Sequence, residues 1–215
     1  MTRDNLGKAI ADGCEALGQS YSDEQLDQFS TLLRELGRWG ARVNLTAIRD
    51  LDEMVSGHLL DSLSVLPFLN GSSVIDLGTG AGFPGLPLAI ANPELEVVCL
   101  DSNGKKIGFV QHIITKLRLS NASAIKSRAE DYAPGRTFDT VIARALATIP
   151  RIIEVGGHLL GEKGVLLALK GRQPAAELEE TAKLPGGWTW QTERVSVPGL
   201  EQHDRHIVRL ERQGI

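Results

Sequence analysis

The sequence predicts an α/β protein organised around a mainly parallel sheet, and three features of the chain support this. From Ser73 onward, short apolar runs alternate with longer amphipathic runs, as they do in successive β–α units. The run VIDLGTGAGFPG at 74–85 indicates a buried strand that passes through a glycine-rich turn into a helix. The last two β-rich runs have no helical run between them, which predicts an antiparallel hairpin at the sheet edge.

The composition is that of an ordinary globular protein of one domain, or of one domain with a small extension. The chain has 215 residues, of which 42% are apolar and 23% are charged. It begins without an apolar leader, contains no apolar run of about 18 residues, and has only two cysteines. We therefore expect a cytoplasmic protein without a membrane span. The net charge of −4 argues against a general nucleic-acid coat protein.

Residues 1–70 are predicted to form a helical extension and residues 71–215 the sheet domain, together making one compact unit. Ser22 and Gln25 have the spacing of a capping box at a helix start. Apolar residues then recur at spacings of three and four, at Phe29, Leu32, Leu36, Trp39 and Val43. On roughly the opposite face lie Arg34, Arg38 and Arg42. This face has two interpretations, a solvated polar surface or a stripe that contacts phosphates.

A second helix is expected over about 52–66, ended by Pro67. His58 and Asp61 lie three residues apart in it and would be neighbours on the helix surface. For a histidine such as His58, a structural role is the more ordinary interpretation, and a catalytic role is the alternative.

The remaining elements follow from the alternation of patterns. Strands of the parallel part are expected at 73–78, 96–101, 122–127, 138–144 and 165–170. Helices are expected between them at about 85–92, 104–118 and 148–161, and a further one after Pro174. The two strands of the terminal hairpin are expected within 188–198 and 206–211.

Two acids mark the ends of the first two strands and bear on the ligand. Asp101 is placed to accept hydrogen bonds from the hydroxyls of an adenosine ribose. Gly80, Gly82 and Gly85 fit the GxGxxG pattern of NAD-binding proteins, which leaves NAD open. Asp76 would repel a pyrophosphate but attract the α-ammonium of a methionine group. Together with the DxGxG form and the terminal hairpin, this favours S-adenosylmethionine. A turn that binds nothing is the third interpretation.

Several further motifs lie in a fixed order along the chain. DLGTGAGFPG, LDSNGKK, SRAED, ARA and LKG follow one another, and RWGARVNLT and HLLDSL precede them. Together they resemble the RsmG family, also called glucose-inhibited division protein B, over about 22–208. The resemblance implies a Rossmann-like methyltransferase sheet that uses S-adenosylmethionine, with a terminal antiparallel hairpin and an N-terminal helical extension.

The same resemblance implies an activity and a partner. Members of the family methylate N7 of a guanine in bacterial 16S ribosomal RNA, at nucleotide 527 of the 530 loop. The expected partner is 16S ribosomal RNA in the small ribosomal subunit or its late precursor, with neither DNA nor a membrane involved. One departure concerns Val43, because the family commonly has an aromatic residue before NLT. A stacking role is therefore not expected at this position.

The cofactor site is predicted partly by resemblance and partly by chemistry. By resemblance the cofactor contacts are Gly78, Phe83, Ala129, Glu130 and Arg144. The charge of Asp76, the ribose-binding position of Asp101 and the place of Gly80 in the glycine turn add these three residues. Ala129 and Glu130 are expected at the adenine end.

The expected reaction makes few demands on catalytic groups. Guanine N7 has a free lone pair and no proton, so an in-line attack on the sulfonium methyl needs no general base. Catalysis would then rest mainly on positioning. Arg144 and Asp61 are the candidate catalytic residues, and Asp61 or Glu130 is a candidate for stabilising the charged product. His203, Asp204 and His206 lie near the last strand, but they offer too few ligands to predict a metal site.

Contacts to RNA are expected from basic residues near the carboxyl ends of the strands. The candidates there are Arg144, Lys170, Arg172, Lys105 and Lys106. Basic residues expected to lie farther away are Arg34, Arg38, Arg42 and Arg49.

Overall fold

The computed structural model describes residues 3–40 and 43–213, and within them it forms one seven-stranded sheet. The strands are β1 (Ser73–Leu77), β2 (Glu96–Asp101), β3 (Ala122–Lys126), β4 (Phe138–Arg144), β5 (Leu160–Lys170), β6 (Trp188–Arg194) and β7 (His206–Arg212). Their order is β3-β2-β1-β4-β5-β7-β6. The first five strands are parallel, while β7 runs antiparallel to both β5 and β6. The predicted α/β fold with a terminal hairpin is confirmed.

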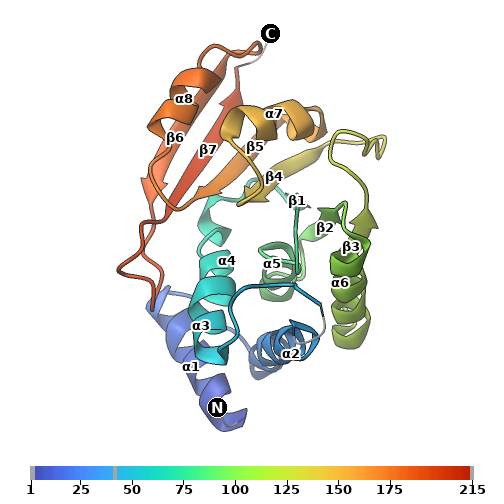
Figure 1. The fold of residues 1–215 in the computed structure, drawn as a ribbon, viewed down its shortest axis with the longest axis vertical. Coiled ribbons are helices and arrows are strands. Elements are labelled where there is room, and N and C mark those ends of the chain that lie inside the picture. The colour runs from blue at the N-terminus through green and yellow to red at the C-terminus, as the bar shows by residue number, and fades with distance from the viewer. Residues whose placement is uncertain (1–2, 41–42, 214–215) are drawn as a thin grey trace.

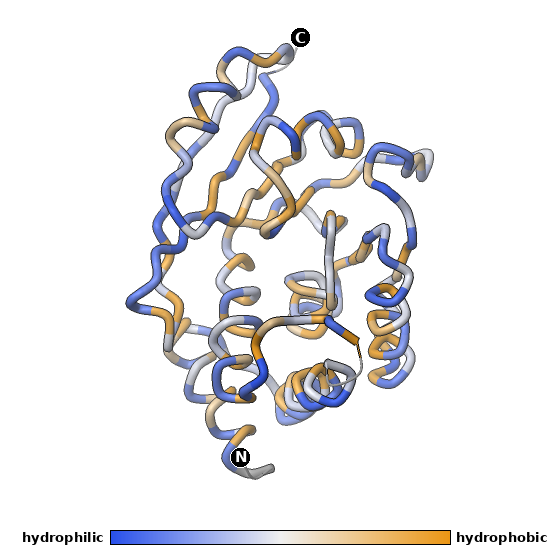
Figure 2. The backbone as a smooth tube through the Cα atoms, viewed as in Figure 1, coloured by the Kyte–Doolittle hydropathy of each residue, from blue (hydrophilic) through white to orange (hydrophobic). Residues whose placement is uncertain are grey.

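Helices cover both faces of the sheet (Figure 1). They are α1 (Arg3–Ala16), α2 (Asp23–Gly40), α3 (Leu51–Met54), α4 (Asp61–Leu63), α5 (Gly85–Ala91), α6 (Gly104–Leu117), α7 (Ile149–Gly156) and α8 (Ala175–Thr181). Successive strand residues face opposite sides, so Val74 packs with α2, α5 and α6, whereas Ile75 packs with α7 and α8. Figure 2 shows apolar residues recurring along the strands and helices, and the side chains of the two core clusters are buried.

The hydrophobic core on the first face is shared between the sheet and the N-terminal helices. Leu6 of α1 and Phe29 of α2 belong to the same buried cluster as Val74 and Val97 of the sheet. The core therefore continues across the predicted boundary near residue 70. The division into 1–70 and 71–215 itself stays a prediction.

The helix predicted over 52–66 differs from the observed one. It begins at Leu51, where Asp50 caps it by accepting a hydrogen bond from the backbone N of Asp52 at 2.8 Å. After α3 the chain widens into a π-helical segment, η1 (Val55–Leu60), before α4 ends at Leu63. Pro67 lies in a separate 3₁₀ turn, η2 (Leu66–Phe68). π-Helical turns are rare in proteins, and those that occur are often found at functional sites.

The prediction of a helix over 148–161 is wrong at its C-terminal end. Helix α7 ends at Gly156, a short 3₁₀ turn η3 (Gly157–Leu159) follows, and β5 begins at Leu160. Strand β5 therefore has 11 residues and pairs with β4 from Phe138 onward. Glycines at 156 and 157 disfavour continuation of the helix.

The order in which the chain adds strands to the sheet reverses at β1. Neighbours of β1 are β2 on one side and β4 on the other, and the strand order proceeds outward from this point in both directions. In open α/β sheets, ligands bind in the crevice outside the carboxyl ends of such strands. Leu77 of β1 is paired with Ala143 of β4, so Gly78 and the residues after Ala143 lie at this crevice.

Candidate functional site

The glycine turn that follows β1 has a conformation that few other residues adopt. Gly78 and Gly80 have φ values of 66° and 60°. A Cβ atom on Gly78 would lie 2.6 Å from Cδ1 of Leu146, so the turn also needs the missing side chain for packing. Apart from the adjacent residues, the nearest atom to a Cβ on Gly80 would be the backbone O of Gly78 at 3.9 Å, an ordinary contact distance, and Gly80 lines a cavity described below. Gly80 therefore faces open space in which a ligand has room to approach the backbone.

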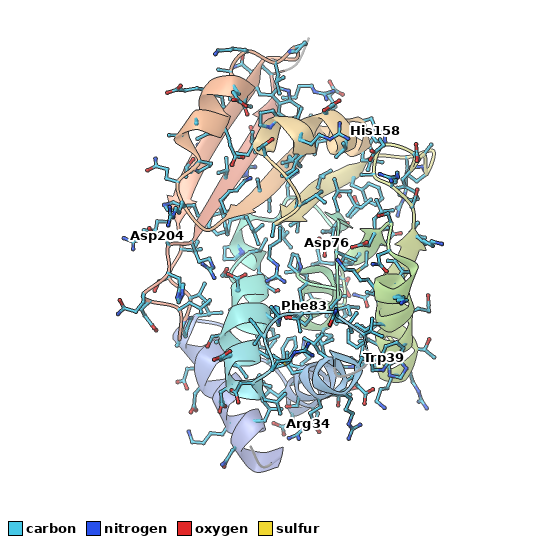
Figure 3. All side chains as sticks on the ribbon, viewed as in Figure 1. Arg34, Trp39, Asp76, Phe83, His158 and Asp204 are labelled. Atoms are coloured by element: carbon cyan, nitrogen blue, oxygen red, sulfur yellow. The ribbon has the colours of Figure 1, made fainter. Side chains whose placement is uncertain are left out.

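Asp76, labelled in Figure 3, bonds to one residue in this turn and to one after it, and so stabilises its shape. Its Oδ2 accepts hydrogen bonds from Oγ1 of Thr79 at 2.6 Å and from the backbone N of Gly85 at 2.9 Å. The side chain is buried, and burial raises the pKa of Asp76 to about 6. Its Oδ1 is buried without a hydrogen-bond partner among the described residues. The bonds to Thr79 and Gly85 give Asp76 an indirect role, in which it supports the turn. Direct contact between Asp76 and a cofactor ammonium stays a prediction.

Asp101, at the end of β2, connects the second strand to the same turn. Its Oδ2 accepts from the backbone N of Gly80 at 3.0 Å, and its Oδ1 accepts from the backbone N of Asn103 at 2.8 Å. Nζ of Lys106 lies 3.9 Å from Oδ2. A carboxylate has about four acceptor positions, so Asp101 retains capacity for hydroxyl groups of a ligand.

Two cavities meet at the carboxyl edge of the sheet. The first, which we call the β2 cavity, measures about 380 Å³ and includes Gly78, Asp101, Ala129, Glu130 and Leu146 in its lining. The second, which we call the η1 cavity, measures about 480 Å³ and includes Gly78, Gly80, Phe83, Arg144, His58 and Asp61. Gly78, Lys106 and Ala145 line both. All the predicted cofactor residues except Asp76 therefore line one of two adjoining cavities.

The η1 cavity is held together by one carboxylate between two guanidinium groups. Oδ2 of Asp61 accepts from Nη1 of Arg144 at 3.0 Å, and Oδ1 accepts from Nε of Arg205 at 2.9 Å. Arg144 also donates to the backbone O of Gly57 at 3.3 Å. These contacts join the N-terminal helices, the end of β4 and the loop before β7. The sequence pattern did not predict a role for Arg205, because nothing in its local pattern distinguishes it from other exposed loop arginines.

His58 forms part of the wall of the η1 cavity. Its ring lies against Phe83, with centroids 5.0 Å apart, and its Nε2 is 2.7 Å from Oγ1 of Thr46. Burial, followed by the nearby charge of Arg144, lowers the pKa of His58 to about 4. The ring is therefore neutral near pH 7, and its low pKa makes it a weak base. No hydrogen bond joins it to Asp61 among the described contacts.

Some of the basic residues predicted to contact RNA also have partners within the protein, and their role toward RNA stays a prediction. Lys170 forms an ion pair with Glu177 at 2.8 Å and donates to the backbone O of Ala147 at the same distance. Arg38 pairs with the buried Glu35 at 2.8 Å. Arg49, expected to lie farther from the site, lines neither the β2 cavity nor the η1 cavity at the strand ends but a separate hollow that also includes Lys105 and Lys106. Arg42 lies outside the described residues.

Neither a metal site nor a membrane span emerges from the described part of the chain. No group of three or more His, Cys, Asp or Glu side chains in it is arranged to hold a metal ion. Asp204, one of the residues considered for such a site, pairs with Arg194 at 2.9 Å. No helix within residues 3–40 and 43–213 is long and apolar enough to cross a membrane.

Comparison with known proteins assigns the chain to a family. The model of the family described as rRNA small subunit methyltransferase G matches residues 25–208. The chain belongs to this family. Ribosomal RNA small subunit methyltransferase G of Xanthomonas axonopodis pv. citri is 47% identical over 199 residues, covering 90% of this chain and 92% of that protein. The protein of the same name from Legionella pneumophila strain Lens is 46% identical over 181 residues, covering 82% and 85%.

Solved structures with low sequence identity share the fold. A SAM dependent methyltransferase from Aquifex aeolicus has a TM-score of 0.55 and 20% identity, covering 74% of this chain and 92% of that one. TYW2 of M. jannaschii, solved in complex with AdoMet, has a TM-score of 0.59 and 17% identity, covering 80% of each chain. As a member of the methyltransferase G family, the chain is an S-adenosylmethionine-dependent rRNA methyltransferase. Family membership thus decides against NAD, which the glycine spacing had left open.

Proposed function

We propose that the chain methylates N7 of a guanine in 16S ribosomal RNA within the small ribosomal subunit or its late precursor. By family resemblance, the target is nucleotide 527 in the 530 loop, and the enzyme works in the cytoplasm. The observation that carries the proposal is the pair of cavities that meet at Gly78, Lys106 and Ala145. Such an arrangement allows a methyl donor and a nucleobase to lie next to each other.

The residues around the β2 cavity fit the adenosine part of S-adenosylmethionine. Asp101 is held by backbone N–H groups and retains acceptor capacity for two ribose hydroxyls. Leu146, the most exposed large apolar side chain of the described residues at 40%, lines this cavity and offers an apolar contact for a ring. Ala129 and Glu130 complete the same wall. We assign the adenine end of the cofactor to this cavity.

The methionine part would extend past the glycine turn toward the η1 cavity. Gly78 lines both cavities, and Gly80 leaves open space beside the backbone. Phe83 and Arg144 lie on the η1 side, and the Arg144 guanidinium is 5.9 Å from the centroid of the Phe83 ring. Arg144 is a cation that suits the cofactor carboxylate, with Asp61 holding it in place. When bound, the cofactor supplies the electrophilic methyl group.

The chemistry of the η1 cavity agrees with an attack that needs no base. Guanine N7 has no proton to lose, and the imidazole in the cavity, His58, is a weak base because its pKa is lowered to about 4. Positive charge moves from the sulfonium to the guanine within one site, so the net charge of the site is unchanged. The contribution of the protein is then to orient the base toward the methyl group and to exclude water.

A transfer assay tests this function directly. Purified protein is incubated with labelled S-adenosylmethionine and small ribosomal subunits from a strain that lacks the enzyme, and the labelled nucleotide is then mapped. The proposal predicts one labelled guanine, at position 527, that is sensitive to chemical cleavage at 7-methylguanosine. Absence of transfer, or label on another atom or nucleotide, would contradict it. Free 16S ribosomal RNA serves as the comparison that shows whether assembly of the subunit is required.

A further inference from the structure

A third hollow lies next to the two cavities, between the end of α2 and the start of α6. It measures about 380 Å³, and we call it the α6 hollow. Its lining consists of Gly40, Val43, Asn44, Arg49, Asn103, Lys105 and Lys106. Three of these residues are cations, and none of the described lining residues carries a carboxylate. Helices α2 and α6 lie side by side here (Figure 1).

Of the two lysines at the start of α6, Lys106 has its Nζ 3.9 Å from Oδ2 of Asp101, whereas Lys105 has no ion pair among the described residues. Lys105 and Lys106 lie in the first turn of α6, which contains no acidic residue. Asn103 caps this helix by accepting from the backbone N of Lys105 at 2.9 Å. Because the N-terminus of a helix carries a partial positive charge, lysines there are unfavourable, and an anion in the hollow would offset the repulsion.

Arg49 supplies a further positive charge from the opposite side. Its Nη1 donates to the backbone O of Gly40 at the end of α2, and this bond fixes the guanidinium at the hollow. Arg38 contrasts with it, because Arg38 and Lys116 of α6 each form an ion pair with the buried Glu35, at 2.8 Å and 3.5 Å.

The hollow adjoins the site in which the target base is expected. Lys106 lines the α6 hollow, the β2 cavity and the η1 cavity. On the other side, Asn44 lines the hollow and the next residue, Leu45, lines the η1 cavity. A strand whose base enters the η1 cavity would therefore pass a neighbouring phosphate over three cations.

We propose that the α6 hollow binds a phosphate of the RNA strand next to the target nucleotide. This inference rests on the proposed function, since it takes the substrate to be RNA. Arg49 and Lys105 would contact the phosphate, and Lys106 would lie between the phosphate and the cofactor. Such a contact positions the strand without reading its sequence. It also explains how a protein with a net charge of −4 attracts RNA at one place.

Lys105 provides the main test, because it is exposed and lines neither the β2 cavity nor the η1 cavity. Its substitution to alanine or glutamate is therefore expected to leave the fold and the affinity for S-adenosylmethionine unchanged. Binding of unmodified small ribosomal subunits is measured over a range of salt concentrations. Lys105→Ala should weaken binding about tenfold, and Lys105→Glu should weaken it further.

The salt dependence reports the phosphate contact itself. For an oligouridylate probe, loss of one contact should reduce the slope of log K against log salt by about 0.7. Lys163→Ala and Lys163→Glu are the matched controls, since Lys163 is an exposed lysine near the start of β5, at the opposite edge of the sheet. Arg49→Gln should weaken binding and reduce the salt slope as Lys105→Ala does. Circular dichroism checks that this variant still folds without the bond from Arg49 to the backbone O of Gly40.

Three outcomes would overturn the inference. One is equal affinity and equal salt slope for Lys105→Glu and Lys163→Glu. Another is displacement of oligouridylate by polyglutamate at the same charge concentration, which would indicate a general polyanion surface. A third is a large loss of S-adenosylmethionine affinity in Lys105→Ala, which would assign the residue to the cofactor. Failure of the proposed function is separate, because it would appear as missing or misplaced methylation by the unsubstituted protein.

Discussion

The β2 cavity and the η1 cavity adjoin each other, yet they are built in different ways. Most residues of the β2 cavity lie at strand ends or directly after them, such as Gly78 after β1 and Asp101 at the end of β2. The η1 cavity instead joins η1 and α4 to the end of β4 and to the loop before β7, through Asp61, Arg144 and Arg205. The first cavity is built mainly at strand ends, and residues of α6 and α7 complete it. The second depends also on η1 and α4, from the part of the chain that precedes the sheet.

Gly80→Val tests whether the space beside the turn belongs to the ligand, and it should have the largest effect. A valine side chain would enter the η1 cavity, and affinity for S-adenosylmethionine should fall by about a hundredfold. Valine is also strained at a positive φ, so the control is Gly135→Val, at an exposed glycine with φ of 71° where an added Cβ would meet no atom within 4 Å. Calorimetry should show loss of binding only in the first variant. Equal affinities would mean that the turn does not face the cofactor.

Asp61→Asn breaks the connection between the three parts of the η1 cavity. It removes the charge that holds Arg144 and Arg205, so methyl transfer to small subunits should slow by roughly ten- to a hundredfold through misplacement of the reacting groups. Affinity for S-adenosylmethionine should change much less, because the β2 cavity is intact. Asp204→Asn, an exposed acid paired with Arg194 near the same loop, is the control. Asp61→Glu should restore part of the rate, and a rate unaffected in Asp61→Asn would show that the two arginines need no carboxylate.

Two buried groups near the cavities respond to pH in opposite directions. Asp76 below the turn has a pKa raised to about 6, so the native state holds an extra proton between about pH 4 and 6, and stability falls as pH rises through that range. His58 has a pKa lowered to about 4, so the unfolded state holds the extra proton, and stability rises with pH between about 4 and 6.5. The two effects oppose each other.

Each variant should lose the pH dependence of stability that comes from the substituted group and keep that of the other group. In Asp76→Asn, the free energy of unfolding relative to the unsubstituted protein should increase by about 2 to 3 kcal/mol from pH 4 to pH 7. In His58→Gln it should decrease over the same range by a comparable amount, because the pKa of His58 is shifted about as far in the opposite direction. Urea denaturation at several pH values measures both. Parallel pH profiles for the two variants and the unsubstituted protein would contradict these assignments.

The same contrast explains how far the sequence could predict the molecule. Asp101 and Ala129 lie in short motifs at strand ends, and the rule that parallel strands end at one edge was sufficient to bring them together. Arg205 contacts Asp61 across 144 residues of sequence, and only the folded chain shows that pairing. The η1 turn was missed for a similar reason, because its 3.6-residue apolar pattern is also that of an ordinary α-helix.

Some roles could be assigned only from contacts. The sequence correctly placed Asp76 at the end of a strand, but its bonds to Thr79 and Gly85 show that it supports the turn from inside. Arg49 was expected to be remote, yet its bond to Gly40 brings it to the α6 hollow beside the site. Local pattern thus identified the residue types, whereas their distribution between cofactor, substrate and support depended on tertiary structure.

The central claim is that the β2 cavity binds the adenosine part of the cofactor, whereas the η1 cavity receives its methionine part and the target base. Calorimetric titration of S-adenosylmethionine into Asp101→Asn and Asp61→Asn proteins tests it most directly. Affinity should fall about tenfold in Asp101→Asn, because hydrogen bonds to a charged acceptor are lost. It should fall much less in Asp61→Asn, because Arg144 keeps its bond to the backbone O of Gly57 and the β2 cavity is unchanged. Equal losses in the two variants, or a loss confined to Asp61→Asn, would contradict this division of the site.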